Sequence, residues 1–204
     1  MHVALIGATG QVGSRVLDEL LSRGHRVTGI VRGVEHLPIR PGLTRRRGDV
    51  MDQPGLVGLL SGHDAVVSAV KFKDCDTQQL IDSVEAAGTR RYIVVGGAGS
   101  LEVAPGVRVM DTPGFPTHVR PEALLGGEFL DQLRASRLDW TFFSPSLFLV
   151  PGERTGEFRY GKDQLMTTAD GSKPASISLE DYAMALVDEL ESPLHLRQRF
   201  TVGY

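Results

Sequence analysis

Short apolar runs alternate with longer segments of helical period through the first half of the chain. Except for the third, these runs are rich in Val, Ile and Leu, as expected for strands that helices cover on both sheet faces. They are His2–Ile6, Arg26–Val31, Leu43–Arg47, Ala65–Val70 and Tyr92–Val95. The segments with helical spacing are Val12–Arg23, Gln53–Leu60 and Thr77–Ala87. This alternation predicts an α/β fold in which crossover helices join parallel strands.

The pattern changes after Ser100, where about twenty residues are interrupted by Pro105, Pro113, Gly114, Pro116 and Pro121. A loop of this length is more than a connector, and we expect it to cover an active site. The elements predicted beyond it are a helix at Pro121–Ser136, a strand at Trp140–Ser144, a hairpin of Glu157–Tyr160 with Leu165–Thr168, a capped helix at Ser178–Leu190 and a strand at Phe200–Val202. We expect residues 1–204 to form one domain, in which the part from about residue 145 completes a substrate pocket.

Composition narrows the class of protein. The 204 residues are 41% hydrophobic and 23% charged, which is ordinary for a water-soluble globular domain. The net charge of −3 gives no general attraction for nucleic acid, and strand alternation divides the basic run Arg45–Arg47 between two faces. We therefore expect a small-molecule partner, no nucleic-acid or membrane partner, and a monomer or homodimer.

Cysteine usage and hydropathy bear on compartment and metal binding. Cys75 is the single cysteine, so no internal disulfide can form. No apolar stretch approaches the ~20 residues that span a bilayer, and no apolar leader precedes the first strand. No paired cysteines or His-x-x-x-His spacing indicates a metal site. These features predict a cytoplasmic protein without a bound metal.

A glycine-rich turn connects the first strand to the first helix. Its sequence, from Gly7, is Gly-Ala-Thr-Gly-Gln-Val-Gly. In this context Gly7 permits the tight turn, Gly10 lets the backbone approach a pyrophosphate, and Gly13 lets the helix pack on the strand. The helix N-terminus adds free amides and a favourable dipole. The pattern predicts a dinucleotide site formed by Gly7, Thr9, Gly10, Gln11, Val12 and Gly13; the alternative is a turn that only connects two elements.

The end of the second strand predicts the choice of cofactor. A carboxylate there would bind the adenosine ribose and favour NAD, but the chain has Val31-Arg32. Arginine can pair with a 2′-phosphate through two hydrogen bonds. We therefore predict NADP(H), with NAD less favoured. The alternative for Arg32 is an exposed cation that pairs with Glu35.

Further lining residues follow from the rule that parallel sheets bind ligands beyond the carboxyl ends of their strands. Asp49, with Val50, either approaches the adenine or caps the next helix. Lys71 either extends toward phosphates or substrate, or belongs to an exposed basic turn. The residues expected along the ribose and nicotinamide, with close packing as the alternative, are Ala69, Val70, Gly96 and Gly97.

The glycine turn, Gly48-Asp49-Val50, Val94–Ser100 and Ser144-Pro145-Ser146 together resemble the atypical short-chain dehydrogenase/reductase superfamily. The nearest likeness is to NAD(P)H-binding proteins related to NmrA-like regulators and to the flavin reductase that also reduces biliverdin. The resemblance implies a Rossmann-type doubly wound parallel sheet with a small C-terminal substrate-covering appendage. It also implies that the strand Trp140–Ser144 runs beside the nicotinamide carboxamide, with Pro145 at the cofactor.

The superfamily's Tyr-x-x-x-Lys pair, which supplies a proton to a carbonyl, is missing from this chain. Three residues are candidates to replace it. The resemblance places Ser100 where a serine or threonine orients the substrate oxygen, and Ser146 beside the carboxamide. His118, in the long loop, titrates near working pH. The alternatives are a turn cap for Ser100 and a solvated side chain for His118.

These residues predict an NADPH-dependent oxidoreductase that passes hydride to a planar acceptor such as a flavin, quinone or conjugated carbonyl. Such acceptors need less help from a protein acid. A second interpretation is a non-catalytic NADP(H) sensor resembling NmrA-like proteins. A third is an epimerase, isomerase or dehydratase that uses bound NADP.

Overall fold

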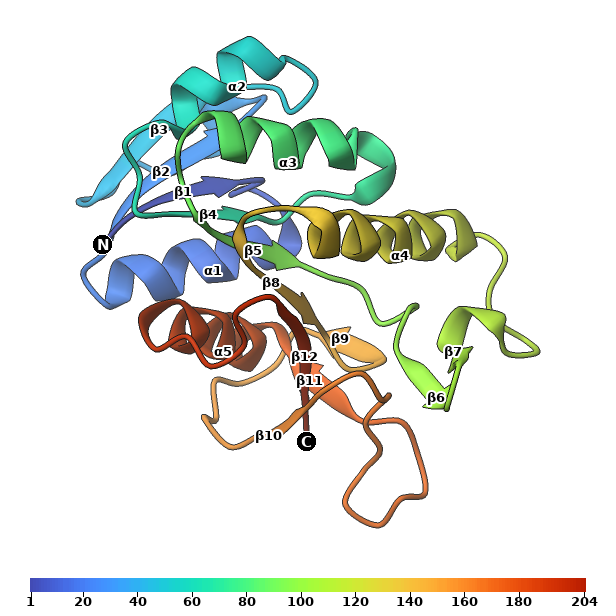
Figure 1. Ribbon diagram of the computed structural model, residues 1–204. Helices are drawn as coiled ribbons and strands as arrows, with labels where there is room; N and C mark the ends of the chain where they lie inside the picture. The colour runs from blue at the N-terminus through green and yellow to red at the C-terminus, as the bar shows by residue number, and fades with distance from the viewer.

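The computed structural model describes residues 1–204 as three layers, with a central sheet between two layers of helices (Figure 1). The sheet has eight strands in the order β10-β12-β8-β5-β4-β1-β2-β3. All neighbours are parallel except the edge pair β10 and β12. The first strand lies between β4 and β2, so the strand order reverses there, as in a Rossmann-type doubly wound sheet.

The elements have the following bounds. The strands of the main sheet are β1 His2–Ile6, β2 Arg26–Val31, β3 Leu43–Arg47, β4 Ala65–Ser68, β5 Arg91–Val95, β8 Asp139–Ser144, β10 Arg159–Gly161 and β12 Gln198–Gly203. The α-helices are α1 Gln11–Ser22, α2 Gln53–Leu60, α3 Thr77–Ala86, α4 Arg120–Ala135 and α5 Leu179–Glu191. Short 3-10 turns are η1 Val34–His36, η2 Phe72–Asp74 and η3 Val109–Asp111. Two small sheets pair β6 Glu102–Ala104 with β7 Val107–Arg108, and β9 Phe148–Val150 with β11 Ser176–Ser178.

Two apolar cores hold the layers together. One lies between the sheet and the pair α1 and α5, and includes Leu17, Leu186 and the stacked rings of Phe143 and Tyr182, 4.1 Å apart. The other lies under α2, α3 and α4, and includes Leu80 and Phe129. Because helices cover both faces, the central strands are apolar throughout rather than alternating. This explains why the strand positions of the first half follow directly from the sequence.

The C-terminal part departs from the predicted hairpin. The strand β10 does not pair with Leu165–Thr168; it pairs antiparallel with β12, where Tyr160 faces Val202. The Leu165 amide instead donates to the Glu102 carbonyl of β6. The turn at Gly161-Lys162-Asp163 therefore redirects the chain toward β6, because β10 finds its hydrogen-bond partners on the open edge of β12. The small strands β6, β7, β9 and β11 were not predicted.

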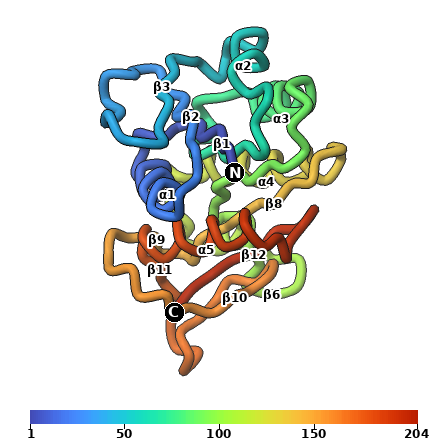
Figure 2. Tube along the Cα trace, turned by 90° about the vertical axis from the view of Figure 1, so that its left-hand side faces the viewer, coloured from blue at the N-terminus to red at the C-terminus, as the bar shows by residue number.

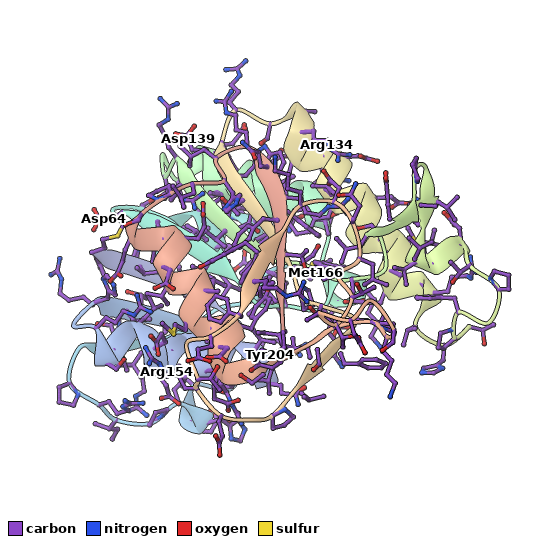
Figure 3. All side chains as sticks on the ribbon, turned by 90° about the horizontal axis from the view of Figure 1, so that it is seen from below. Asp64, Arg134, Asp139, Arg154, Met166 and Tyr204 are labelled. Atoms are coloured by element: carbon purple, nitrogen blue, oxygen red, sulfur yellow. The ribbon has the colours of Figure 1, made fainter.

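The small strands gather at one end of the molecule. In Figures 1 and 2, β6, β9, β10, β11 and the C-terminus lie at the end remote from α2 and β3. Arg154 and Tyr204, labelled in Figure 3, lie beside the helix pair that covers this face of the sheet. The guanidinium of Arg154 binds Glu19 of α1 at 2.8 Å, and the Tyr204 hydroxyl donates to Asp181 of α5 at 2.8 Å. These bonds attach the C-terminal segments to the main sheet's helices.

The buried carboxylate of Asp181 gives a pH-dependent stability. Burial alone would raise its pKa. Hydrogen bonds from Thr155, Gly156 and Tyr204 lower the pKa by more than burial raises it, so the pKa lies below its usual value. The stabilisation is therefore complete above about pH 4 and is lost as the pH falls through the folded-state pKa. We expect Asp181→Asn to lower the free energy of unfolding by about 2 kcal/mol at pH 7 and by less at pH 3.

Urea denaturation of both proteins across this pH range measures the difference. Asp82, exposed on α3, provides the control, since its replacement by Asn should cost less than about 0.5 kcal/mol. An unfolding free energy of Asp181→Asn that differs from the wild type by the same amount at pH 7 and pH 3 would contradict the role given to the carboxylate.

Candidate functional site

The glycine turn after β1 is closely packed against its neighbours. Gly7 adopts φ +81°, and a Cβ there would lie 2.9 Å from the carbonyl carbon of Ala69. A Cβ on Gly13 would lie 2.9 Å from the carbonyl carbon of Gly7. Both distances are too short for real Cβ contacts, so only glycine lets α1 begin directly against the end of β1.

The first turn of α1 has no side-chain cap, whereas Asp52, Asp76 and Ser178 cap α2, α3 and α5. Gly10 occupies the cap position of α1. The amides of Gln11, Val12 and Gly13 consequently have no acceptor within the chain. Free amides at a helix N-terminus favour an anion such as a phosphate.

A cavity of about 310 Å³ opens beside this turn at the carboxyl ends of β1, β2 and β4. It is lined by predicted residues from the glycine turn and from the three loops after β2, β3 and β4. These are Gly7, Thr9, Gly10, Arg32, Asp49, Val50, Ala69, Val70 and Lys71. The sequence did not indicate the other lining residues, which are Ile6, Ile30, Val31, Gly48 and Asp74. We call this the first cavity.

The structure decides between the alternatives given above for Arg32 and Asp49, the polar side chains of the first cavity. Arg32 is exposed and has no hydrogen-bond or ion-pair partner, since Glu35 instead contacts His36 at 3.5 Å. Asp49 lines the cavity and does not cap α2, because the Gly55 amide donates to Asp52. An unpaired cation and a carboxylate therefore both line the first cavity.

A second cavity, of about 260 Å³, lies beyond the carboxyl end of β5. Its lining is mostly apolar or glycine: Phe72, Gly97, Ala98, Gly99, Ser100, Phe115, Val119, Glu122, Ala123, Gly126 and Leu147. Phe115 and Val119 come from the proline-rich loop, which therefore contributes to the cover of this cavity. Of the predicted site residues, Gly97 and Ser100 line it.

The two cavities are linked by one short segment. Lys71 lines the first cavity and the next residue, Phe72, lines the second. The Glu122 carboxylate of α4 fixes this segment by accepting the amides of Phe72 at 2.8 Å and Lys73 at 3.0 Å. Gly126 is required here, because a Cβ on it would lie 2.7 Å from the Phe72 ring. The segment thus forms a fixed wall between the two spaces.

Other predicted residues have packing contacts instead. A Cβ on Gly96 would lie 2.5 Å from the Phe142 ring, so this glycine serves close packing. Pro145 and Ser146 are buried, and the Ser146 hydroxyl donates to the Val202 carbonyl of β12. His118 is exposed and lines neither cavity, although its neighbour Val119 lines the second. Ser146 and His118 are thus not brought together with Ser100.

None of the four tyrosines lines either cavity. Tyr92 and Tyr182 are fully buried, and their hydroxyls bond to Ser68 at 2.8 Å and to the Phe143 carbonyl at 2.5 Å. Burial raises the pKa of both phenols. Tyr160 lies at the sheet edge on β10, and Tyr204 bonds to Asp181. No phenol is therefore available as a proton donor in these cavities.

The thiol of Cys75, close to the wall between the cavities, is expected to react slowly. Burial, together with the charges of Glu122, Asp74 and Asp76, raises its pKa to about 11. At pH 8 the thiolate fraction is therefore small, and we expect reaction with a disulfide reagent to be on the order of a hundredfold slower than for an unperturbed cysteine. Stopped-flow measurements on folded and guanidinium-unfolded protein compare the two states. Equal rates would contradict this.

Comparison with known proteins assigns the family. The model of a family described as NAD(P)H-binding matches residues 7–193. The chain belongs to this NAD(P)H-binding family. Its resemblance to the atypical short-chain dehydrogenase/reductase class is thereby confirmed, and so is the Rossmann-type fold.

Individual relatives cover nearly the whole chain. The uncharacterized protein YwnB of Bacillus subtilis is 39% identical over 99% of this chain and 98% of its own length. A solved structure from Bacteroides thetaiotaomicron, described as a candidate epimerase, is 42% identical with a TM-score of 0.93, over 100% of this chain and 96% of the other. A candidate NADH-flavin reductase from Streptococcus pneumoniae is 34% identical with a TM-score of 0.83, over 100% and 99%.

No helix of this chain is both long and apolar enough to cross a membrane.

Proposed function

We propose that the protein is an NADPH-dependent oxidoreductase that reduces a planar acceptor. The observation that carries the proposal is that the two cavities are neighbours, one on each side of the Lys71–Phe72 segment. The first lies beside the free amides of the glycine turn and is lined by the unpaired cation Arg32, and a phosphorylated dinucleotide needs both. The lining of the second is mostly apolar or glycine, which suits an aromatic ring.

The residues around the first cavity fit the dinucleotide. The uncapped amides of Gln11, Val12 and Gly13 would hold the pyrophosphate, and the absence of a Cβ on Gly10 leaves room for it. Arg32 would bind the 2′-phosphate, because its guanidinium has no competing carboxylate partner. These roles favour NADPH over NADH.

The residues around the second cavity would orient and shield the acceptor. Phe72, Phe115 and Leu147 supply an apolar surface against which a planar ring can pack. Bound NADPH supplies the hydride, and the chain holds the acceptor close to it and excludes water. Positioning of this kind lowers a barrier by several kcal/mol without a general acid. A quinone or flavin suits a site without a phenolic proton donor.

The experiment is a turnover assay with a panel of acceptors. Oxidation of NADPH is followed by absorbance with FMN, 1,4-naphthoquinone and a conjugated ketone, and NADH is tested in parallel. We expect turnover with at least one planar acceptor and a lower KM for NADPH than for NADH. Tight NADPH binding with no oxidation by any acceptor would overturn the proposal.

Tight NADPH binding without oxidation would favour a dinucleotide sensor resembling NmrA-like proteins. The observation in its favour is that neither cavity is lined by a tyrosine. A sensor should capture a protein partner only in the presence, or only in the absence, of NADP(H). An epimerase, isomerase or dehydratase would instead convert its substrate without net consumption of NADPH; the Bacteroides relative bears such a description.

A further inference from the structure

The Ser100 hydroxyl accepts one hydrogen bond from the chain and donates none. The Arg199 guanidinium donates from Nη1 to the Ser100 carbonyl at 2.8 Å and to the Ser100 Oγ at 3.0 Å. A guanidinium can only donate, so Oγ must act as the acceptor in this bond. No group of the chain accepts the Ser100 proton. Since Ser100 is 8% exposed and lines the second cavity, that cavity is where its proton can find an acceptor.

Arg199 is itself rigidly held. Its side chain is 5% exposed, and its Nε and Nη2 donate to the same Asp163 oxygen at 2.8 and 2.7 Å. The planar fork of an arginine fixes all its N–H directions once two of them are bound. The main chain of Asp163 is fixed as well, because its carbonyl accepts the Glu102 amide. The direction from which Arg199 approaches Ser100 is therefore determined by β12 and the turn after β10.

We propose that Arg199 is a positioning residue that turns the Ser100 hydroxyl toward the second cavity, where it donates a hydrogen bond to a carbonyl oxygen of the acceptor. The proposal rests on the proposed function and deepens it, since it selects acceptors with an oxygen at the ring edge, such as quinones. The nearby positive charge of the guanidinium also polarises the O–H bond and strengthens it as a donor.

The chemistry requires no covalent step on the serine. As hydride adds to the acceptor, negative charge develops on its carbonyl oxygen, and the Ser100 hydrogen bond stabilises that charge. Water supplies the proton that completes the reduction. Ser100 keeps its own proton throughout, so the serine–arginine pair replaces the electrostatic part of a tyrosine's role rather than its proton transfer.

Three variants test the arrangement with 1,4-naphthoquinone as the probe. Ser100→Ala should lower kcat about a hundredfold with an unchanged KM for NADPH, as loss of an oxyanion donor does elsewhere. Ser100→Thr, which keeps the hydroxyl, should recover most of this loss. Arg199→Lys should lower kcat roughly tenfold alone and not at all in the Ser100→Ala background, because the arginine acts only through the serine.

The matched control is Arg91→Lys. Arg91 is another arginine with little exposure, 11% for its side chain, and it pairs with Glu189 at 3.1 Å. It lies at the amino end of β5, whereas Ser100 follows the carboxyl end. It should lose stability as Arg199→Lys does, while kcat stays at the wild-type value. Independent, multiplicative losses for Ser100→Ala and Arg199→Lys would show that Arg199 is merely structural and overturn the proposal.

A binding measurement separates this proposal from the proposed function. The dissociation constant of 1,4-naphthoquinone is measured by calorimetry on protein saturated with NADP⁺, where no turnover occurs. We expect weaker binding in Ser100→Ala and Arg199→Lys and unchanged binding in Ser100→Thr and Arg91→Lys. If the wild type oxidises no NADPH, the proposed function fails, but the binding pattern still tests the role of Arg199 and Ser100. Equal quinone affinities across all five proteins would overturn the role proposed for Arg199.

Discussion

Replacing Gly13 by alanine is expected to weaken NADPH binding about a hundredfold and to lower the Tm by about 10 °C. The added Cβ would lie 2.9 Å from the carbonyl carbon of Gly7, so either the helix α1 or the turn must move. Overpacking of this kind costs about 3 kcal/mol at the upper end of its usual range. Any such shift also displaces the amides of Gln11 and Val12, which would hold the pyrophosphate.

The control for this substitution is Gly58→Ala. Gly58 lies within α2, and a Cβ there meets no atom within 4 Å. Because alanine is the better helix former, this variant should gain about 0.5–1 kcal/mol in stability and bind NADPH normally. Thermal unfolding and fluorescence titration, the latter well below both Tm values, measure the two effects. Wild-type affinity in folded Gly13→Ala would exclude the glycine turn from the cofactor site.

The sequence indicates the first cavity well because its determinants are local. The glycine turn occupies a few consecutive residues between a strand and a helix, and Gly7 and Gly13 have the close contacts that such spacing implies. Arg32 follows directly after β2, whose end can be located from its apolar run, and Asp49 comes two residues after the end of β3. Parallel strands bring these ends to one edge, so the chain order alone places the residues together.

The second cavity is not predictable in the same way. Phe72, Phe115 and Leu147 are far apart in the sequence and meet through loops and the start of α4. No periodicity marks such residues, because a loop's path depends on tertiary contacts such as the bonds from Glu122 to the segment after β4. The length of the proline-rich loop predicts that it covers a site, but the sequence does not indicate that Phe115 and Val119 are the residues that line the cavity.

The apolar pattern of the final strand does not indicate the role of Arg199. The final strand was predicted from Phe200 because the apolar run begins there, whereas β12 begins at Gln198. A buried arginine on a strand indicates a buried ion pair. The partners of Arg199 could not be identified from the sequence, however, because Asp163 and Ser100 lie 36 and 99 residues away. The same is true of β10: its strand character was visible, but the identity of its partner, β12 rather than the next segment, was not.

Arg32→Ser should change the coenzyme preference more than any other exposed substitution. The side chain lines the first cavity, is exposed and has no partner that must be broken before a phosphate binds. Hydrogen bonds to charged groups contribute about 2–3 kcal/mol, so NADPH should bind roughly 30- to 150-fold more weakly. NADH has no 2′-phosphate, and its affinity should stay within about twofold because the other contacts are unchanged.

Arg26→Ser is the matched control, because Arg26 is exposed at the opposite end of the same strand, β2. Calorimetric titration of both coenzymes into wild type, Arg32→Ser and Arg26→Ser gives the six dissociation constants. The wild-type preference for NADPH should also shrink as salt is raised, since an exposed ion pair is screened, whereas the NADH affinity should hardly respond. An equal loss for both coenzymes in Arg32→Ser would mean that the guanidinium supports the site without reading the 2′-phosphate. The pyrophosphate contacts of the glycine turn would then remain as the basis for binding, without selection between the two coenzymes.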